Sequence, residues 1–373
     1  MYKFILAIFT LLLIVTENAA ASNSNYIKFE KEINHLIDEY KIPGLALAII
    51  DKNKIIHQKN YGIISYKNNQ KVDSKTIWQI ASISKTFLAA SLAILADKGQ
   101  FSWESNIDAE IEEFELNDIV AQSKLTFHDI ASMQSGLTAS AGKDYIINLN
   151  NRKEIIKIFS NIKPIYPVGE GYFSYQYAII SIIEEIIENK TKKSWQNFIK
   201  SSIFSPLKLY NTGIDVHNLN NKLNVAFPYD QYNKELLWEN FKINAAAGFY
   251  SNLEDMVKWL QFNMKEGKVG KKQLISIAQM QKIHKKYTPI KNFETQLFRD
   301  QNISSIYYGY FWKTLVYRWK NKDITIYEHN GNCNGMSSII SYIPERNIGI
   351  IVLSNKVTPV PEMIRSKFIQ YFN

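Results

Sequence analysis

The feature that most constrains the fold is the stretch from Ile80 to Ala96, in which nearly every residue is apolar or small. These residues cover all sides of a helix rather than one stripe, and such a helix is buried on every side. Gly99 provides a C-terminal stop shortly after it. The rest of the chain must therefore surround this helix, and 373 residues are enough to build a core of that size.

Ser82 and Lys85 lie in the first turn of this helix, three residues apart, so their side chains share one face. A serine beside a lysine at the polar end of a buried helix is typical of an activated nucleophile. The spacing S-x-x-K is weak evidence by itself because it also occurs at Ser140, Ser160 and Ser205. Only the copy at Ser82 begins a long apolar helix, and spacing alone favours an N-cap role for that serine.

Composition excludes several classes of function. A hydrophobic content of 46% with 13% aromatic residues is that of a globular protein. The six histidines and the single cysteine, Cys333, show no metal-ligand spacing, so we expect no metal site, no cofactor and no internal disulfide. The net charge of +9 includes basic runs at 265–272 and 282–286, but these lack a nucleic-acid motif. We therefore predict no nucleic-acid partner.

Residues 1–21 have the pattern of a secretory signal peptide. Lys3 precedes an apolar run from Phe4 to Val15, and Ala19–Ala21 supplies an A-x-A cleavage site before Ser22. The run is too short to span a bilayer, and no cysteine follows it for lipid attachment. We expect an exported protein, in the periplasm, the cell envelope or the medium, without a stable membrane span after cleavage.

Predicted strands lie at both ends of the chain, and predicted helices lie between them. After a helical pattern over 27–40, Leu45–Ile50 and Ile55–Tyr61 flank a polar turn and predict a hairpin. Four strands followed by a helix are predicted in the C-terminal third: Tyr307–Val316, Ile324–His329, Met336–Ile343, Ile348–Ser354 and the helix Pro361–Phe372. Helical patterns are predicted between the two ends at Thr126–Met133, Ile179–Glu188, Trp195–Phe204 and Leu253–Met264.

This order predicts an α+β fold with one antiparallel sheet, built from both chain ends and flanked by helices. We assign residues 26–80 and 236–373 to the sheet domain and residues 81–235 to an inserted, mostly helical domain. The Ser82 helix would lie at the junction of the two, where catalytic clefts usually form.

Six segments, in order, resemble the serine β-lactamase-like superfamily, which includes class C β-lactamases, D-alanyl-D-alanine carboxypeptidases and related esterases. The resemblance covers roughly residues 33–372. It is carried by IPGLALAIIDKNKIIHQKNYG, TIWQIASISKTFLA, LTFHDIASMQSGL, IFSPLKLYNTGI, NAAAGFYSNLEDMVKWL and HNGNCNGMSSIISYIPERNIGIIVLSN. It implies the β-lactamase/transpeptidase-like fold, with Ser82 as the nucleophile and Lys85 as its partner in proton transfer.

The family's second motif is Y-x-N, and its tyrosine assists proton transfer. An alignment without gaps through the helix that follows places this tyrosine at Tyr175 and puts Tyr177 at the substrate-binding position of the Asn. Tyr172 is the alternative, and it requires three extra residues in that helix. The motif's Asn is missing under either alignment.

The third motif is K-T-G or H-x-G, and here it is His329-Asn330-Gly331. The resemblance implies that His329 acts near Ser82 as a donor or weak cation. Gly331 would let the substrate backbone run close beside the strand. The family's oxyanion hole would use the backbone N–H groups of Ser82 and Asn332.

The resemblance thus implies an exported serine hydrolase that forms an acyl-enzyme and acts on an ester, a D-alanyl peptide or a β-lactam. Its substrate would be a small or peptidoglycan-derived molecule, and no obligate protein partner is evident. The missing Asn and the H-x-G motif favour an esterase or D-Ala peptidase. The alternatives are a true class C-like β-lactamase and a non-catalytic homologue that binds penicillin or peptides.

Overall fold

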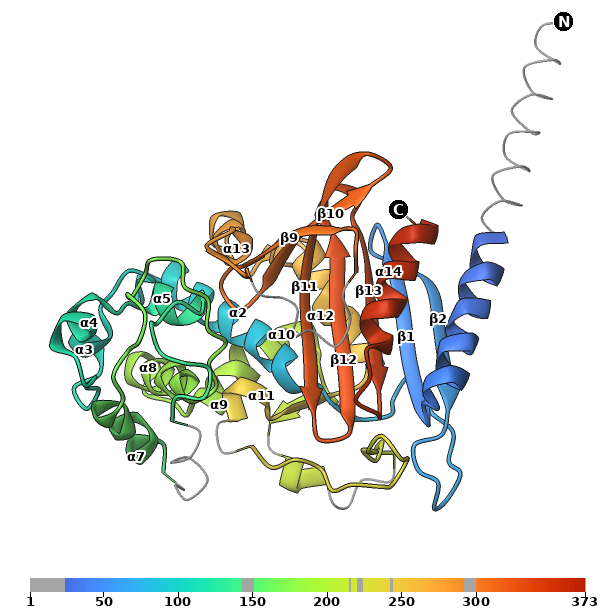
Figure 1. Ribbon diagram of the computed structural model, residues 1–373, viewed down its shortest axis with the longest axis horizontal. Helices are drawn as coiled ribbons and strands as arrows, with labels where there is room; N and C mark the ends of the chain where they lie inside the picture. The colour runs from blue at the N-terminus through green and yellow to red at the C-terminus, as the bar shows by residue number, and fades with distance from the viewer. Residues whose placement is uncertain are drawn as a thin grey trace, which may run out of the picture.

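An eight-stranded antiparallel sheet forms the centre of the computed structural model, which describes residues 24–142, 151–214, 216–219, 224–241, 244–291 and 300–372 (Figure 1). The strand order is β2-β1-β13-β12-β11-β10-β9-β8. The strands are β1 (Gly44–Asp51), β2 (Lys54–Gly62), β8 (Thr288–Pro289), β9 (Ile303–Tyr308), β10 (Lys313–Trp319), β11 (Lys322–Cys333), β12 (Met336–Ile343) and β13 (Ile348–Ser354). Because β1 pairs with β13, the predicted α+β fold with a sheet built from both chain ends is confirmed.

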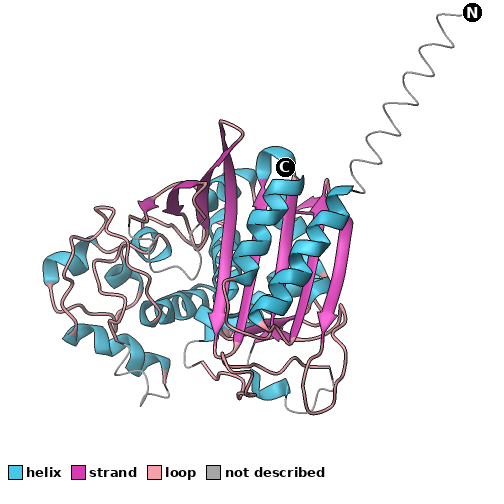
Figure 2. Ribbon diagram, turned by 45° about the vertical axis from the view of Figure 1, so that its right-hand side comes forward, coloured by secondary structure: helices cyan, strands magenta, loops and turns pink. Residues whose placement is uncertain are grey.

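Both faces of the sheet are covered. Every residue of β13 is buried, and β1 is buried except at Asp51. Strands buried along their whole length must be covered on both faces of the sheet. Figure 2 shows the helix of residues 24–40 and α14 (Val360–Phe372) crossing one face. The rings of Tyr26 and Phe372 lie 5.0 Å apart and join these two terminal helices. On the other face, α12 (Leu253–Met264) contacts β1, β12 and β13.

The apolar helix predicted from Ile80 to Ala96 consists of a single turn, η1 (Ala81–Ile83), followed by α2 (Ser84–Asp97). Every residue from Ser84 to Leu95 is buried, as the all-round apolar pattern predicts. Gly99 follows the helix with a φ of +67°, which confirms it as the stop. The helix contacts α8, α11 and α13, so it lies between the sheet and the helical part.

The helices of the middle of the chain gather beside the sheet, to the left in Figure 1. The α-helices not yet given are α3 (Ile107–Glu110), α4 (Ile119–Lys124), α5 (Phe127–Ala131), α7 (Arg152–Lys157), α8 (Ser181–Thr191), α9 (Trp195–Ile199), α10 (Ser205–Leu207), α11 (Asn244–Ala247) and α13 (Ile277–His284). Single turns of other helix types are η2 (Ile158–Asn161), η3 (Ala178–Ile180), η4 (Lys200–Phe204), η5 (Val216–Leu219) and η7 (Pro344–Arg346). Short strands form two small sheets: β3 (Trp78–Gln79), β5 (Phe249–Ser251) and β4 (Gly213–Ile214) in one, and β6 (Lys268–Val269) with β7 (Lys272–Gln273) in the other.

One predicted strand differs from the structure. The predicted strand Tyr307–Val316 is two strands, β9 and β10, because a turn closes between them through a hydrogen bond from Gly309 N to Trp312 O. Phe311 in this turn has a φ of +55°, which no strand residue adopts.

The predicted signal peptide, residues 1–21, lies outside the described residues. Within the described ranges, no helix is long and apolar enough to cross a membrane.

Candidate active site

The turn that carries Ser82 has a strained backbone, and the Ser82 hydroxyl caps neither of the helices beside it. Ala81 has a φ of +45°, a conformation that residues with a Cβ rarely adopt and that occurs at functional turns. Ile80 and Ile83 occupy the N-cap positions of η1 and α2, and neither helix has a side-chain cap. Ser82 is therefore not an N-cap, and its half-buried side chain is available for other contacts.

Lys85 is directed at Ser82. Its side chain is only 1% exposed, and its Nζ donates hydrogen bonds to Ser82 Oγ at 3.2 Å and to the carbonyl oxygen of Ala246 at 2.7 Å. Among the described residues, no carboxylate forms an ion pair with Lys85. The predicted pair is thus brought together, with the amine held by a backbone carbonyl beside the serine oxygen.

The carbonyl that holds Lys85 belongs to the small-residue helix α11, which is fixed by a buried carboxylate. Glu184 of α8 accepts a hydrogen bond from the backbone N–H of Ala245 at 3.0 Å. Arg152 lies 3.8 Å from Glu184 and also pairs with Glu185 and Glu188 on the same helix. Burial raises the pKa of Glu184 to about 7. The position of Lys85 therefore depends on a carboxyl group that titrates near neutral pH.

Replacing Glu184 by glutamine should remove a pH dependence of stability. Folded Glu184 keeps its proton up to about pH 7, whereas in the unfolded chain it loses the proton near pH 4.5. Between pH 4.5 and about pH 7 the folded state binds more protons than the unfolded state. The free energy of unfolding of the wild type therefore falls by about 3 kcal/mol as the pH rises through this range. We expect the difference in free energy of unfolding between Glu184→Gln and wild type to increase by about 3 kcal/mol from about pH 4.5 to about pH 8. Denaturant titrations of both proteins at the two pH values measure this difference.

Glu188→Gln is the matched control, one turn later on α8. Burial acts to raise the pKa of Glu188, but hydrogen bonds from Arg152 and from the Trp195 backbone lower it overall. Its charge therefore stabilises the fold above pH 4.5, and the substitution should destabilise the protein there. Identical pH dependence in wild type and Glu184→Gln would contradict the raised pKa of Glu184.

The structure separates the two candidate tyrosines. Lys85 Nζ lies 4.9 Å from the ring centroid of Tyr175, which is half-buried. Tyr172 is 46% exposed and stacks on Tyr166, with ring centroids 5.3 Å apart. Tyr175 is thus the tyrosine beside the Ser82–Lys85 pair. Tyr177, predicted at the Asn position, packs near Phe241 with ring centroids 6.3 Å apart, and its substrate-binding role stays a prediction.

His329 lies in β11 and is 1% exposed. Its Nδ1 lies 2.7 Å from the carbonyl oxygen of Asn330, and its Nε2 lies 3.0 Å from the hydroxyl of Tyr308. Burial, and then the charges of Lys313 and Lys85, lower the pKa of His329 well below its usual range. The lowered pKa favours a neutral imidazole, and the predicted role of His329 as a donor or weak cation stays a prediction.

Gly331 brings β11 against the nucleophile turn. A Cβ at this position would lie 2.2 Å from the carbonyl oxygen of Ile80 and 2.7 Å from Ser338 Oγ. The glycine is therefore required for the packing of β11 on the nucleophile turn, and the close approach of a substrate backbone stays a prediction. Asn332 comes next in the strand, pairs with Ser337 and has an exposed side chain. Its backbone N–H as half of an oxyanion hole stays a prediction.

Sequence reasoning missed four residues that support the site: Tyr308, Lys313, Glu184 and Ala246. Lys313 Nζ donates to Asn330 Oδ1 at 2.6 Å, next to His329. None of them belongs to a short motif, and each reaches the site from a different element. The aromatic run around Tyr308 gave no signal that separates one of its tyrosines from the others.

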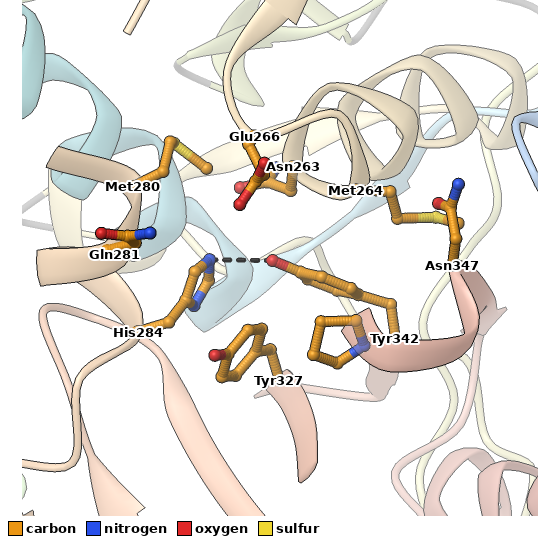
Figure 3. Close-up of a pocket in the computed structure, with 10 residues that line it drawn as sticks. Asn263, Met264, Glu266, Met280, Gln281, His284, Tyr327, Tyr342 and Asn347 are labelled. Carbon is orange, nitrogen blue, oxygen red and sulfur yellow. Dashed lines mark hydrogen bonds between the residues drawn. The ribbon is translucent and has the colours of Figure 1, made fainter. Parts of the chain in front are cut away.

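A separate cavity of about 330 Å³ contains none of the predicted site residues. It lies between α12, α13, β11 and β12, and Figure 3 shows His284, Tyr342 and Glu266 among its lining. The hydroxyl of Tyr342 lies 2.9 Å from His284 Nε2, and burial lowers the pKa of His284 to about 3. This buried histidine is thus neutral and structural. No group of three or more His, Cys, Asp or Glu residues in the described ranges could hold a metal ion.

The sheet, the inserted helices and the serine–lysine pair at their junction define the class of protein to which this fold belongs. The solved structure of an octameric penicillin-binding protein homologue from Pyrococcus abyssi matches with a TM-score of 0.76, over 92% of this chain and 76% of that one. At 21% sequence identity this match shows the fold alone. The architecture is the β-lactamase and penicillin-binding protein-like fold.

Sequence comparison identifies the family. The family model described as Beta-lactamase matches residues 29–370, so the chain belongs to the beta-lactamase family. A Beta-lactamase from Psychrobacter immobilis is 26% identical over 390 residues, covering 95% of this chain and 90% of that protein. Protein flp from Staphylococcus aureus strain N315 is 23% identical over 362 residues, covering 94% of this chain and 68% of the relative.

Proposed function

We propose that this protein is an exported serine hydrolase that forms an acyl-enzyme on Ser82. The observation that carries the proposal is the position of Lys85, whose Nζ lies 3.2 Å from Ser82 Oγ while its other contact is a backbone carbonyl. Membership of the beta-lactamase family supports the same reading of the pair. Export rests on the signal-peptide pattern of residues 1–21.

The proposed chemistry has two steps. Ser82 Oγ attacks the substrate carbonyl carbon, and its proton passes, with the help of Tyr175, to Lys85 in its neutral amine form, the form that must be populated for this step. The oxyanion is held by the backbone N–H groups of Ser82 and Asn332 until the leaving group departs with a proton. Water then attacks the ester on Ser82, and the acid is released with the serine restored.

The preferred substrate is an ester or a D-alanyl peptide, including a peptidoglycan-derived one. Tyr177 replaces the amide-binding Asn of the second motif, and losing one substrate hydrogen bond can cost several kcal/mol of transition-state binding. A second candidate is a true β-lactamase, which the similarity to the Psychrobacter immobilis Beta-lactamase favours.

Mass spectrometry of the intact protein tests the proposal. The protein is exposed briefly to benzylpenicillin or to a p-nitrophenyl ester, and the mass is followed over time. We expect the ester to acylate the protein and the adduct to decay within the assay. We expect the penicilloyl adduct to form more slowly and to persist.

Other outcomes decide between the alternatives. A penicilloyl adduct that turns over rapidly, with loss of free penicillin, would establish the β-lactamase. If neither reagent adds mass, the hydrolase proposal is wrong and a non-catalytic binding protein replaces it.

A further inference from the structure

The cavity between α12, α13, β11 and β12 is open on one side and closed on the other. Glu266 and Gln281 of its lining are exposed, whereas His284 and Tyr342 are buried. Its volume of about 330 Å³ is roughly twice that of a cavity of about 150 Å³ that accepts benzene, so it has room for a six-membered ring with substituents. Among the described residues that line it there is no lysine or arginine, so the basic runs of the chain do not set its chemistry.

The aromatic side chains of the lining hold one another in place. Tyr327 of β11 and Tyr342 of β12 are cross-strand partners, with ring centroids 5.3 Å apart and ring planes at 73°. The imidazole of His284 stacks on Tyr327 at a centroid distance of 4.1 Å, and the backbone carbonyl of His284 accepts a hydrogen bond from Thr314 Oγ1. A ligand would therefore meet walls that are already ordered, which lowers the entropic cost of binding.

Several polar groups of this lining have no protein partner among the described residues. These groups are the carboxylate of Glu266, the hydroxyl of Tyr327, and the buried Oδ1 of Asn347 and Nδ1 of His284. The hydroxyl of Tyr342, near the centre of Figure 3, bonds to His284 Nε2 at 2.9 Å and keeps either its proton or a lone pair for a second partner. Buried polar groups are normally satisfied, so this lining suits water or a polar ligand.

The kinds of unpaired group decide the chemistry of the ligand. The carboxylate of Glu266 and the Oδ1 of Asn347 only accept hydrogen bonds, whereas the hydroxyl of Tyr327 can also donate one. A carboxylate or phosphate ligand has no proton to offer and would meet the charge of Glu266. An ammonium ion can only donate, and a hydrocarbon would leave all of these groups unpaired. A ring with several hydroxyl groups, which both donate and accept, matches the whole set.

We propose that this cavity binds one neutral sugar ring, whose hydroxyl groups donate to Glu266 and Asn347 and pair with the hydroxyl of Tyr342. The rings of Tyr327 and Tyr342 and the side chain of Met280 cover the C–H groups of the sugar. This inference goes beyond the proposed hydrolase, because none of the residues assigned to the chemistry on Ser82 lines the cavity.

Isothermal titration calorimetry of the full chain tests the proposal with three neutral probes, the methyl glycosides of glucose, galactose and mannose. We expect at least one of them to bind with 1:1 stoichiometry and a dissociation constant of roughly 0.1–10 mM, as is typical for a polar ligand of this size. Cyclohexanol has a similar ring but a single hydroxyl, and the uronate of the same sugar brings a second negative charge to Glu266. Both should bind at least about 10-fold more weakly.

Substitutions in the lining locate the site. Glu266→Gln should weaken sugar binding roughly 5- to 10-fold, because a neutral acceptor replaces a charged one. Tyr342→Phe should weaken it by a similar factor, and thermal unfolding shows whether this buried variant still folds. Glu345→Gln is the matched control: Glu345 is exposed, lies two residues before Asn347 and is not part of the lining, so this variant should bind within about 2-fold of wild type.

Three results would overturn the proposal. If none of the glycosides binds saturably up to roughly 100 mM, the polar groups of the cavity serve water only. If cyclohexanol binds as tightly as the sugar, the cavity selects apolar rings. If Glu345→Gln loses as much affinity as Glu266→Gln, the sugar binds elsewhere or through general surface charge. The outcome is separate from that of the proposed function, because Ser82→Ala should lose acylation and still bind the sugar as wild type does.

Discussion

Replacing Ser82 by alanine is expected to abolish covalent labelling by both the ester and the penicillin. The acylation rate should fall by at least roughly 10⁴-fold, because Ser82 Oγ is the hydroxyl hydrogen-bonded to Lys85 Nζ and the covalent step is lost without it. Intact-protein mass spectrometry and release of p-nitrophenol measure the loss. Stability should be nearly unchanged, since the Ser82 side chain caps neither η1 nor α2.

The matched control for this prediction is Ser205→Ala. Ser205 and Lys208 have the same S-x-x-K spacing, but Ser205 is exposed and lies at a short helix beside Pro206. This variant should acylate at the wild-type rate. Labelling that persists in Ser82→Ala would mean that another residue is the nucleophile, and peptide mapping of the adduct would identify it.

The Ser82–Lys85 pair was predictable from sequence because both of its causes are local. Helical spacing places the two side chains on one face, and the apolar residues that follow require burial on all sides. Strand pairing was equally accessible where a short polar turn joins two strands, as in the hairpin β1–β2. Both were confirmed in the structure.

Other features were not predictable, because they depend on distant parts of the chain. The break between β9 and β10 follows from the packing of Gly309, where a Cβ would lie 2.4 Å from the carbonyl oxygen of Ile283. Gly309 lies inside residues 307–316, but a single glycine in an apolar and aromatic pattern does not distinguish a bulge in a continuous strand from a turn between two strands. The neutrality of His329 depends on Lys313 and on depth of burial, neither of which a motif records.

The contact made by Gly331 was likewise only partly predictable from sequence. A glycine in a strand signals that another chain segment approaches closely, and that much was correct. Which segment of the protein approaches is set by how β11 packs on the nucleophile turn, and that segment is the backbone at Ile80. The close approach therefore positions Ser82 and the strand relative to each other, which is a requirement for any oxyanion hole shared between them.

Replacing Tyr175 by phenylalanine is the second change with a large expected effect. Tyr175 is the tyrosine beside Lys85, and removing its oxygen removes the group proposed to assist proton transfer. We expect the acylation rate constant to fall by about 10²- to 10³-fold, as is typical for loss of an acid–base group. Stopped-flow release of p-nitrophenol from the ester measures this rate.

Tyr172→Phe is the matched control, since it removes the hydroxyl of the tyrosine that a gapped alignment places in the second motif. Tyr172 is exposed and stacks on Tyr166, so its variant should acylate within about 2-fold of wild type, as expected for a surface change that touches no reacting group. If Tyr172→Phe causes the larger loss, the second motif begins at Tyr172.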